Sequence, residues 1–227
     1  MRTVRPYNPG VSIDAQLNER YQSPAGAAAY RDKYKKSWTR RLSNARELAM
    51  IRRALAPLSA LERVLDCPCG AGRLGPTLLA RARHLTAVDR SAAMVAEARE
   101  ALAREAAEGR VDFAVASAHA LPFEDASFDL VVCHRLIHHV GDAQERHAIF
   151  RELARVTRGP VLLSFNDAST LKMRVQALRR RPRRRYAWRP EELAGEAEAA
   201  GLVLEPPIHR LAGAFSLVAV GLFRRRA

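Results

Sequence analysis

The sequence predicts an α/β fold: a doubly wound, Rossmann-like, mostly parallel seven-stranded sheet with helices on both faces and an antiparallel edge strand. The first observation is an alternation, from residue 61 onward, of short apolar runs with longer Ala-, Glu- and Arg-rich helical stretches. Such alternation is typical of parallel sheets built from βα units. The second is an expected strand, Arg63–Cys67, with Val64 and Leu65 as its apolar core, that leads directly into a glycine-rich turn. The third is that no apolar run approaches the roughly 18 residues that a membrane span needs, so the apolar runs are expected to form a core.

The expected elements follow one another in a regular order. A strong helix at 92–108 has Ser91 as its N-cap, since a serine hydroxyl accepts a free backbone N–H at a helix start. The run 128–134 is almost continuously apolar, as expected for a strand covered on both faces. The remaining strands are expected at 63–67, 84–88, 111–116 and 160–165, the remaining helices at 73–83, 143–157 and 190–200, and two closing antiparallel strands at 202–209 and 214–223.

Two basic segments are added to this alternating core, one before it and one within it. Residues 1–60 form an N-terminal extension in which apolar and aromatic residues recur three or four apart over 25–56, a helical pattern. Residues 61–227 form the main domain, with an Arg-rich insertion at 168–189. Within this insertion, residues 172–189 carry nine basic residues and no acidic one, whereas the rest of the main domain is close to neutral. We therefore expect one α/β domain with two basic additions.

The stretch Asp66-Cys-Pro-Cys-Gly-Ala-Gly72 carries much of the functional signal. Gly70 and Gly72 lack a Cβ, so the backbone can bend sharply there and come close to a ligand. With Gly75 they also satisfy the G-x-G-x-x-G pattern of dinucleotide sites. Asp66 separates the two interpretations, because a carboxylate at the strand end would repel a pyrophosphate and attract a cation. The turn therefore favours a cationic ligand such as S-adenosylmethionine.

Three further motifs accompany this turn. Leu121-Pro-Phe123 follows the third strand, Phe128-Asp-Leu-Val-Val-Cys-His134 forms the fourth, and Leu136-Ile-His-His139 comes next. Together with the order strand-Asp-x-x-x-Gly-x-Gly, they resemble class I S-adenosylmethionine-dependent methyltransferases, in particular the small-molecule, ubiquinone-biosynthesis-like subgroup. The resemblance covers about residues 61–223 and implies S-adenosyl-L-methionine as the cofactor.

The resemblance also implies a set of cofactor contacts at the carboxyl ends of the strands. Asp66 and Asp89 flank the cofactor, and Asp89 can hydrogen-bond both ribose hydroxyls, as in other doubly wound folds. One position departs from the family pattern: many members have an aspartate after strand three that accepts a bond from the adenine amine, where this chain has Ser117. A hydroxyl still accepts such a bond, or the backbone near Ala118 and His119 does so. The expected cofactor-binding set is Asp66, Cys67, Gly70, Gly72, Asp89, Arg90, Ser117, Ala118 and His134.

Methyl transfer to oxygen or nitrogen can require a general base whose pKa lies near neutrality. His138 and His139 are the expected catalytic residues, with His134 as the next candidate. The alternative is that these histidines serve capping and packing. The three cysteines are odd in number and match no usual zinc spacing, so neither a disulfide framework nor a metal site is expected.

Substrate contacts are expected from both additions. The N-terminal helical segment would cover the site as a lid and supply Tyr30 and Arg41, and the insertion would supply Arg184 and Tyr186. Clustered arginines beside aromatic side chains suit an anion, either a small acidic molecule, a lipid head group, a phosphorylated sugar or RNA. A pinned surface helix and a solvated loop are the alternative interpretations of these two segments.

These features predict a cytoplasmic S-adenosylmethionine-dependent methyltransferase whose acceptor is a small molecule, namely an anionic metabolite, lipid or sugar. An RNA or protein methyltransferase that uses the Arg-rich stretch is one alternative. Nucleic acid is the less favoured partner, because no Asn-Pro-Pro-Tyr-like element follows the fourth strand. An NAD(P)-dependent oxidoreductase and a cofactor-binding module without catalysis are alternatives from other classes.

Overall fold

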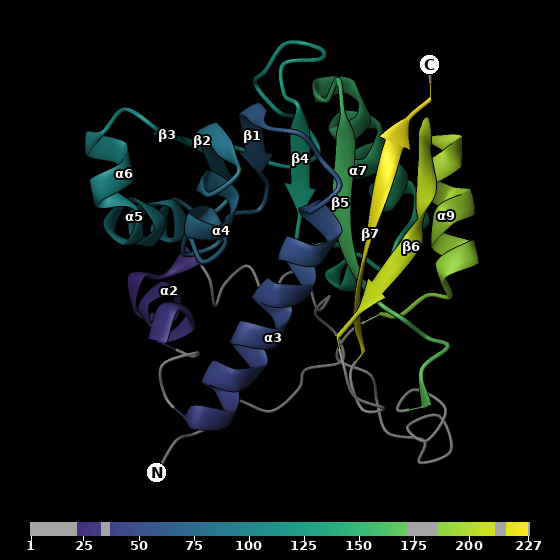
Figure 1. Ribbon diagram of the computed structural model, residues 1–227, viewed down its shortest axis with the longest axis horizontal. Coiled ribbons are helices and arrows are strands. Elements are labelled where there is room, and N and C mark those ends of the chain that lie inside the picture. The colour runs from purple at the N-terminus through teal and green to yellow at the C-terminus, as the bar shows by residue number, and fades with distance from the viewer. Residues whose placement is uncertain (1–21, 33–36, 172–185, 212–216, 227) are drawn as a thin grey trace.

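The computed structural model describes residues 22–32, 37–171, 186–211 and 217–226 of the 227-residue chain. Within these ranges, seven strands form one sheet in the order β3-β2-β1-β4-β5-β7-β6 (Figure 1). The strands are β1 (Leu61–Asp66), β2 (Ala82–Asp89), β3 (Val111–Val115), β4 (Leu130–Cys133), β5 (Pro160–Asn166), β6 (Leu202–Arg210) and β7 (Val218–Arg225).

The strand directions confirm the predicted fold class. Every pair of neighbouring strands within β1 to β5 is parallel. Strand β7 runs antiparallel to both β5 and β6. The sheet is therefore doubly wound and mostly parallel, and its antiparallel part lies at the β6 edge.

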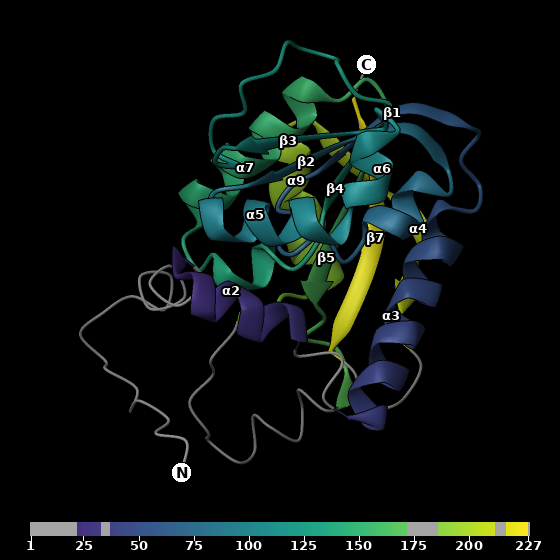
Figure 2. The same cartoon turned by 90° about the vertical axis from the view of Figure 1, so that its left-hand side faces the viewer.

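Helices cover both faces of the sheet, as Figure 2 shows edge-on. Successive residues of a strand point to opposite faces, and β4 illustrates the result. Leu130 and Val132 join the core beneath one group of helices, while Val131 and Cys133 join the core beneath the other. The first group is α3 (Trp38–Leu55), α4 (Gly75–Leu79), α5 (Ala92–Ala101) and α6 (Ala103–Ala107); the second is α7 (Ala143–Val156) and α9 (Pro190–Ala199).

Several element boundaries differ from the sequence-based expectation. The helix expected at 92–108 is divided into α5 and α6 at Leu102, whose φ is −118°. The Leu102 side chain is buried against the glycine turn, since a Cβ on Gly75 would lie 2.6 Å from it. Tertiary packing thus overrides the Ala-rich helical pattern. The helix expected at 73–83 is the five-residue α4, and β4 begins at Leu130, two residues later than expected.

The N-terminal helical pattern also resolves into separate elements. Helix α2 (Pro24–Arg31) lies against α5, where Arg31 Nη1 is 2.6 Å from Glu97 Oε2. Helix α3 packs its C-terminal half on the sheet through buried Ile51 and Leu55.

Candidate cofactor and active site

The sheet has its topological switch point between β1 and β4. From β1 the chain moves to β2 and β3 on one side, and it returns to β4 and β5 on the other. Asp66, the last residue of β1, pairs in register with Ala87 of β2 and Val132 of β4. In open α/β sheets, ligands bind outside the carboxyl ends of the strands at this point. The residues at and just beyond the ends of β1, β2 and β4 therefore form the candidate site.

The glycine turn follows β1, and its two glycines do different things. Gly70 and Gly72 have φ of +53° and +74°, conformations that favour glycine. A Cβ on Gly72 would lie 3.1 Å from the Cα of Ala98, so this glycine lets the turn pack against α5. The nearest atom to a Cβ on Gly70 belongs to the Tyr30 ring, at an ordinary 3.5 Å. Close ligand approach thus suits Gly70, whereas Gly72 is required by packing.

The backbone N–H groups of the three glycines are hydrogen-bonded within the protein. The N–H of Gly72 donates to the carbonyl of Cys69 and that of Gly75 to the carbonyl of Gly72, each at 3.1 Å. The N–H of Gly70 donates to Oδ2 of Asp89 at 3.0 Å. The turn is consequently held by its own hydrogen bonds and by a carboxylate from β2.

Asp89 braces the glycine turn from the end of β2. It is 8% exposed, and its second oxygen, Oδ1, accepts the N–H of Ser91 at 2.9 Å. Burial raises the pKa of Asp89, although the hydrogen bonds from Ser91 and Gly70 act in the opposite direction. The N-cap of α5 is Ser91, as predicted, whose hydroxyl accepts the N–H of Met94 at 3.2 Å. Asp89 is thus a brace with remaining acceptor capacity for ligand hydroxyls.

Asp66 is the most unusual titratable group at the switch point. Its residue is 1% exposed, and no described residue donates a hydrogen bond to its Oδ1. Burial raises its pKa to about 8; nearby Arg73 lowers the pKa and Asp89 raises it. A buried oxygen without a donor is costly in the ligand-free protein. A cationic ligand at this position would offset that cost, so the site fits the sulfonium and ammonium groups of S-adenosylmethionine.

Ser117, the predicted acceptor for the adenine amine, lies in the loop after β3. The Ser117 hydroxyl lies 3.1 Å from Nδ1 of His119 and accepts the His119 N–H at 3.3 Å. Ala118 is buried in the core beside β4. Arg90 is exposed, and Cys67 is buried with its N–H bonded to the carbonyl of Val132 at 2.9 Å.

A buried charge cluster lies just beyond β4, and sequence reasoning missed most of it. His134 Nε2 is 3.0 Å from Oε1 of Glu47, a residue of α3. Arg135 reaches the same carboxylate through Nε and Nη2, both at 2.9 Å, and Arg73 Nη1 lies 3.3 Å away. Glu47 had one detectable signal: it is a carboxylate in helical phase with the apolar residues Met50 and Ile51.

The histidine pair lies in a 3₁₀ turn, η2 (Ile137–His139), directly after this cluster. His138 is 3% exposed and His139 is partly exposed, and their ring centroids are 4.2 Å apart. The carbonyl of His138 accepts the backbone N–H of Tyr186 at 3.0 Å. The structure therefore brings one predicted substrate residue beside the predicted base.

Arg146 of α7 organises the same region. Its Nη1 donates to the carbonyls of Val140 and Gly141 at 3.0 and 2.7 Å. Its guanidinium also forms a bidentate ion pair with the carboxylate of Glu196 in α9, and it lies 4.7 Å from the centre of the Trp188 ring. This buried arginine joins the histidine turn, α9 and the C-terminal end of the Arg-rich insertion.

The other predicted substrate residues are dispersed. Tyr30 of α2 lies over the glycine turn, and Arg41 is exposed on α3. Arg184 lies outside the described residues. Among the described residues, no cluster of histidine, cysteine and acidic side chains could hold a metal ion. Burial raises the thiol pKa of Cys67 and Cys69, which keeps both protonated.

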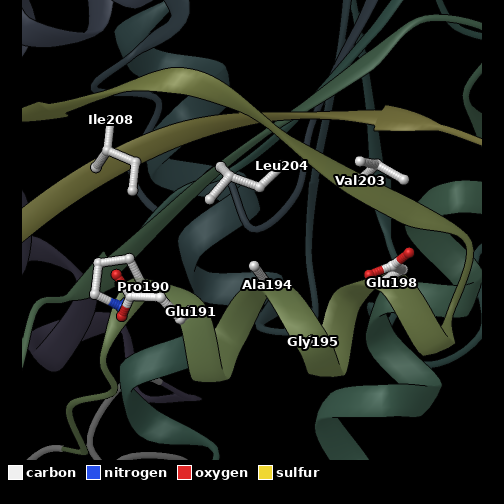
Figure 3. Close-up of a pocket in the computed structure, with 8 residues that line it drawn as sticks. All are labelled: Pro190, Glu191, Ala194, Gly195, Glu198, Val203, Leu204 and Ile208. Carbon is white, nitrogen blue, oxygen red and sulfur yellow. The ribbon is translucent and has the colours of Figure 1, made fainter.

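A surface pocket lies elsewhere, between α9 and β6 (Figure 3). Ala194 of α9 faces Leu204 of β6, and Glu198 lies opposite Val203. Since β6 is separated from β1 by β4, β5 and β7, the pocket lies roughly 20 Å from the switch point. It is therefore distinct from the candidate cofactor site.

The doubly wound sheet and the glycine turn between two buried carboxylates form the arrangement that was expected for a class I S-adenosylmethionine-dependent methyltransferase domain. The cofactor of this class is S-adenosylmethionine. In comparison with known proteins, residues 64–159 match the family model described as "Methyltransferase domain".

Relatives match part of the chain. A demethylmenaquinone methyltransferase of Clavibacter sepedonicus is 42% identical over 79 residues, which cover 35% of this chain and 31% of that protein. The 27-O-demethylrifamycin SV methyltransferase of Amycolatopsis mediterranei is 34% identical over 116 residues, covering 50% of this chain and 41% of that protein. The chain thus spans less than half the length of these curated relatives.

The fold is shared much more widely than the sequence. The crystal structure of magnesium protoporphyrin IX methyltransferase from Synechocystis PCC 6803, with bound SAH, superposes with a TM-score of 0.75 at 19% identity. That comparison covers 93% of this chain and 99% of the other. In the part of the chain that the structure describes, no helix is both long and apolar enough to cross a membrane.

Proposed function

We propose that this protein transfers the methyl group of S-adenosylmethionine to a small-molecule acceptor. The observation that carries the proposal is the buried carboxylate of Asp66, whose Oδ1 accepts no hydrogen bond from the described residues, at the switch point of the sheet. A cationic ligand would supply the missing partner. The small-molecule class is supported by the relatives, whose names specify demethylmenaquinone and 27-O-demethylrifamycin SV as substrates.

Four of the predicted cofactor residues have distinct tasks in this proposal. Asp66 would face the positive charge, and Asp89 would accept the ribose hydroxyls while it braces the turn. Gly70 would allow close approach of the backbone, and Ser117 would accept the adenine amine. The cofactor supplies an activated methyl group when bound, and the rest of the chemistry falls to the protein.

The chain's own contribution to methyl transfer is mainly orientation. The bond from sulfur to the methyl carbon breaks as the bond from the acceptor to that carbon forms, so the two must lie in line. Holding reactants in such geometry can contribute roughly 7–11 kcal/mol. For an O–H or N–H acceptor a proton must also leave, and His138 or His139 is the proposed base.

We propose an anionic acceptor, namely an acidic metabolite, lipid or sugar. Residues 172–189 carry nine basic residues and no acidic one. Tyr186, at the end of this stretch, is hydrogen-bonded to the turn that contains both histidines. Substrate binding by the Arg-rich stretch would therefore take place close to the proposed base.

Calorimetry on the purified protein tests the cofactor. We expect S-adenosylmethionine and S-adenosylhomocysteine to bind in the micromolar range, about −8 kcal/mol, and NAD and NADP to give no signal. A methyl-transfer screen with acidic metabolites, lipids, sugars and RNA then tests the acceptor class. Binding of a nicotinamide dinucleotide alone would reject the assignment, and transfer to RNA alone would reject the small-molecule acceptor.

A further inference from the structure

Helix α3 has a single acidic residue, Glu47, and it is buried at 1% exposure. Glu47 precedes Met50, Ile51 and Ala54 by three, four and seven positions, so all four lie on the face that packs against the sheet. Burying a carboxylate is costly unless it is well paired, and an apolar side chain would dock the helix at lower cost. The position therefore calls for an explanation beyond helix docking.

Glu47 joins the two segments that flank the switch point. Arg73 belongs to the glycine turn after β1, whereas His134 and Arg135 follow β4, and all three lie within 3.3 Å of the Glu47 carboxylate. Asn44, one helical turn earlier, accepts a hydrogen bond from Arg73 at 2.7 Å. Figure 1 shows α3 in front of the sheet, with its N-terminal half extending past the end at which β4 terminates.

The turn after β4 is strained and needs support. Arg135 has φ of +63°, a left-handed conformation that is costly for residues other than glycine. Its backbone N–H donates to the Ser164 hydroxyl of β5 at 2.6 Å, and its guanidinium binds both oxygens of Glu47. These contacts from β5 and α3 stabilise the turn that leads into the histidine pair.

Glu47 also determines which nitrogen of His134 carries hydrogen. Nε2 lies 3.0 Å from the carboxylate, so Nε2 is the donor, and Nδ1 is a buried acceptor with no hydrogen-bond donor among the described residues. Burial lowers the pKa of His134 to about 4; the opposing effect of Glu47 is outweighed, and Arg73 and Arg135 lower the pKa further. The ring is therefore neutral at physiological pH, and the Nδ1 lone pair stays available.

We propose that Glu47 is a positioning residue of the cofactor site: it fixes His134 in the Nε2–H form and holds the Arg135 turn, so that Nδ1 of His134 accepts a hydrogen bond from the bound cofactor. This inference rests on the proposed function, because it assigns the ligand to the switch point. It makes α3 a functional part of the site and assigns His134 to ligand binding, leaving the role of base to His138 or His139.

The test compares Glu47→Gln with a matched control, Asp129→Asn. Asp129 accepts the N–H groups of Glu62 and Arg63 at 2.9 and 2.8 Å and binds Arg158 at 2.7 Å, so it is also a multiply bonded carboxylate. It lies at the opposite, amino end of β1 and β4. We expect Glu47→Gln to weaken S-adenosylhomocysteine binding about tenfold, and the control to lower thermal stability without changing the affinity.

Nitrogen NMR of the histidine-labelled parent protein supplies a second measurement that needs no ligand, with His134→Gln used for assignment. We expect His134 to show the neutral Nε2–H tautomer from pH 8 down to pH 5. Titration within that range, or the Nδ1–H tautomer, overturns the inference, even if Glu47→Gln does not fold. Unchanged cofactor affinity in folded Glu47→Gln also overturns it. A parent protein that binds no S-adenosylhomocysteine instead rejects the proposed function.

Discussion

The backbone N–H of Tyr186 donates a hydrogen bond to the carbonyl of His138 at 3.0 Å. Two further hydrogen bonds join the same segment to β5. Asn166 at the end of β5 donates to the Tyr186 carbonyl and accepts the N–H of Trp188, each at 3.0 Å. The C-terminal end of the Arg-rich insertion is thus anchored to the histidine turn and to β5.

Gly141 provides a direct test of this anchoring. A Cβ on Gly141 would lie 2.2 Å from the Tyr186 ring, so Gly141→Ala must displace that ring. We expect Gly141→Ala to raise the acceptor KM by about tenfold, the equivalent of about 1.4 kcal/mol, while calorimetry shows an unchanged cofactor affinity. Tyr186→Ala should give the same phenotype, and the double variant should lose nothing further. Additive losses would show that the two residues act independently.

Asp66 predicts a pH dependence of stability. Its folded pKa of about 8 lies above the ordinary value near 3.9, so between these values the folded protein binds more protons than the unfolded chain. Stability from this group is complete below pH 4 and is lost as the pH rises to 8, by at most about 1.4 kcal/mol for each pH unit.

Urea unfolding of the ligand-free protein across pH 5 to 8 measures this effect against Asp66→Asn. The parent should lose stability relative to the variant as the pH rises. S-adenosylmethionine should reduce the difference, because a cation favours the ionised carboxylate. Parallel stability curves for the two proteins would mean that Asp66 ionises normally.

Asp89 should matter to both the turn and the nucleoside. Asp89→Ala removes the acceptor of the Gly70 and Ser91 N–H groups, and we expect cofactor affinity to fall at least tenfold, with a loss of stability of roughly 2 kcal/mol. Ser91→Ala is the matched control, since it removes the N-cap of α5 and should cost about 1 kcal/mol of stability with little change in affinity. Equal cofactor affinity in the parent and Asp89→Ala would restrict Asp89 to a structural role.

Substitution of the histidine pair should affect turnover but not cofactor binding. We expect one of the variants His138→Ala and His139→Ala to lower kcat by about 10²–10⁴-fold while the cofactor dissociation constant stays unchanged. His138 is buried, so His138→Gln is needed to distinguish loss of a base from loss of packing. Full turnover in both alanine variants would mean that positioning suffices and that no histidine base operates.

The Arg-rich stretch can be tested through salt dependence, although Arg183, Arg184 and Arg185 lie outside the described residues. Replacing the three with alanine should raise the acceptor KM without changing cofactor affinity. The affinity for a small anionic acceptor should depend only weakly on salt concentration. For single-stranded RNA, the logarithm of the binding constant should fall with the logarithm of the salt concentration, with a slope of about −0.7 for each phosphate contact. A triple variant that matches the parent in KM would identify the stretch as a solvated loop.

The sequence by itself determined the sheet, the glycine turn and the two carboxylates that flank it. These features are local. The strands and α-helices are 4 to 18 residues long, so the hydrophobic period of each is visible within one short stretch of sequence. Asp66, Gly70 and Asp89 occupy fixed places at strand ends or in the turn that follows. Because parallel strands end at one edge of the sheet, their position in the chain was enough to group them.

Tertiary structure alone decided the contacts between distant segments. Glu47 meets His134 across 87 positions of the chain, and Tyr186, near the end of the Arg-rich insertion, meets His138. No periodicity connects such pairs, because their approach depends on the strand order and on which face each helix covers. The same reason explains the break at Leu102, where packing against Gly75 overrides a continuous helical pattern.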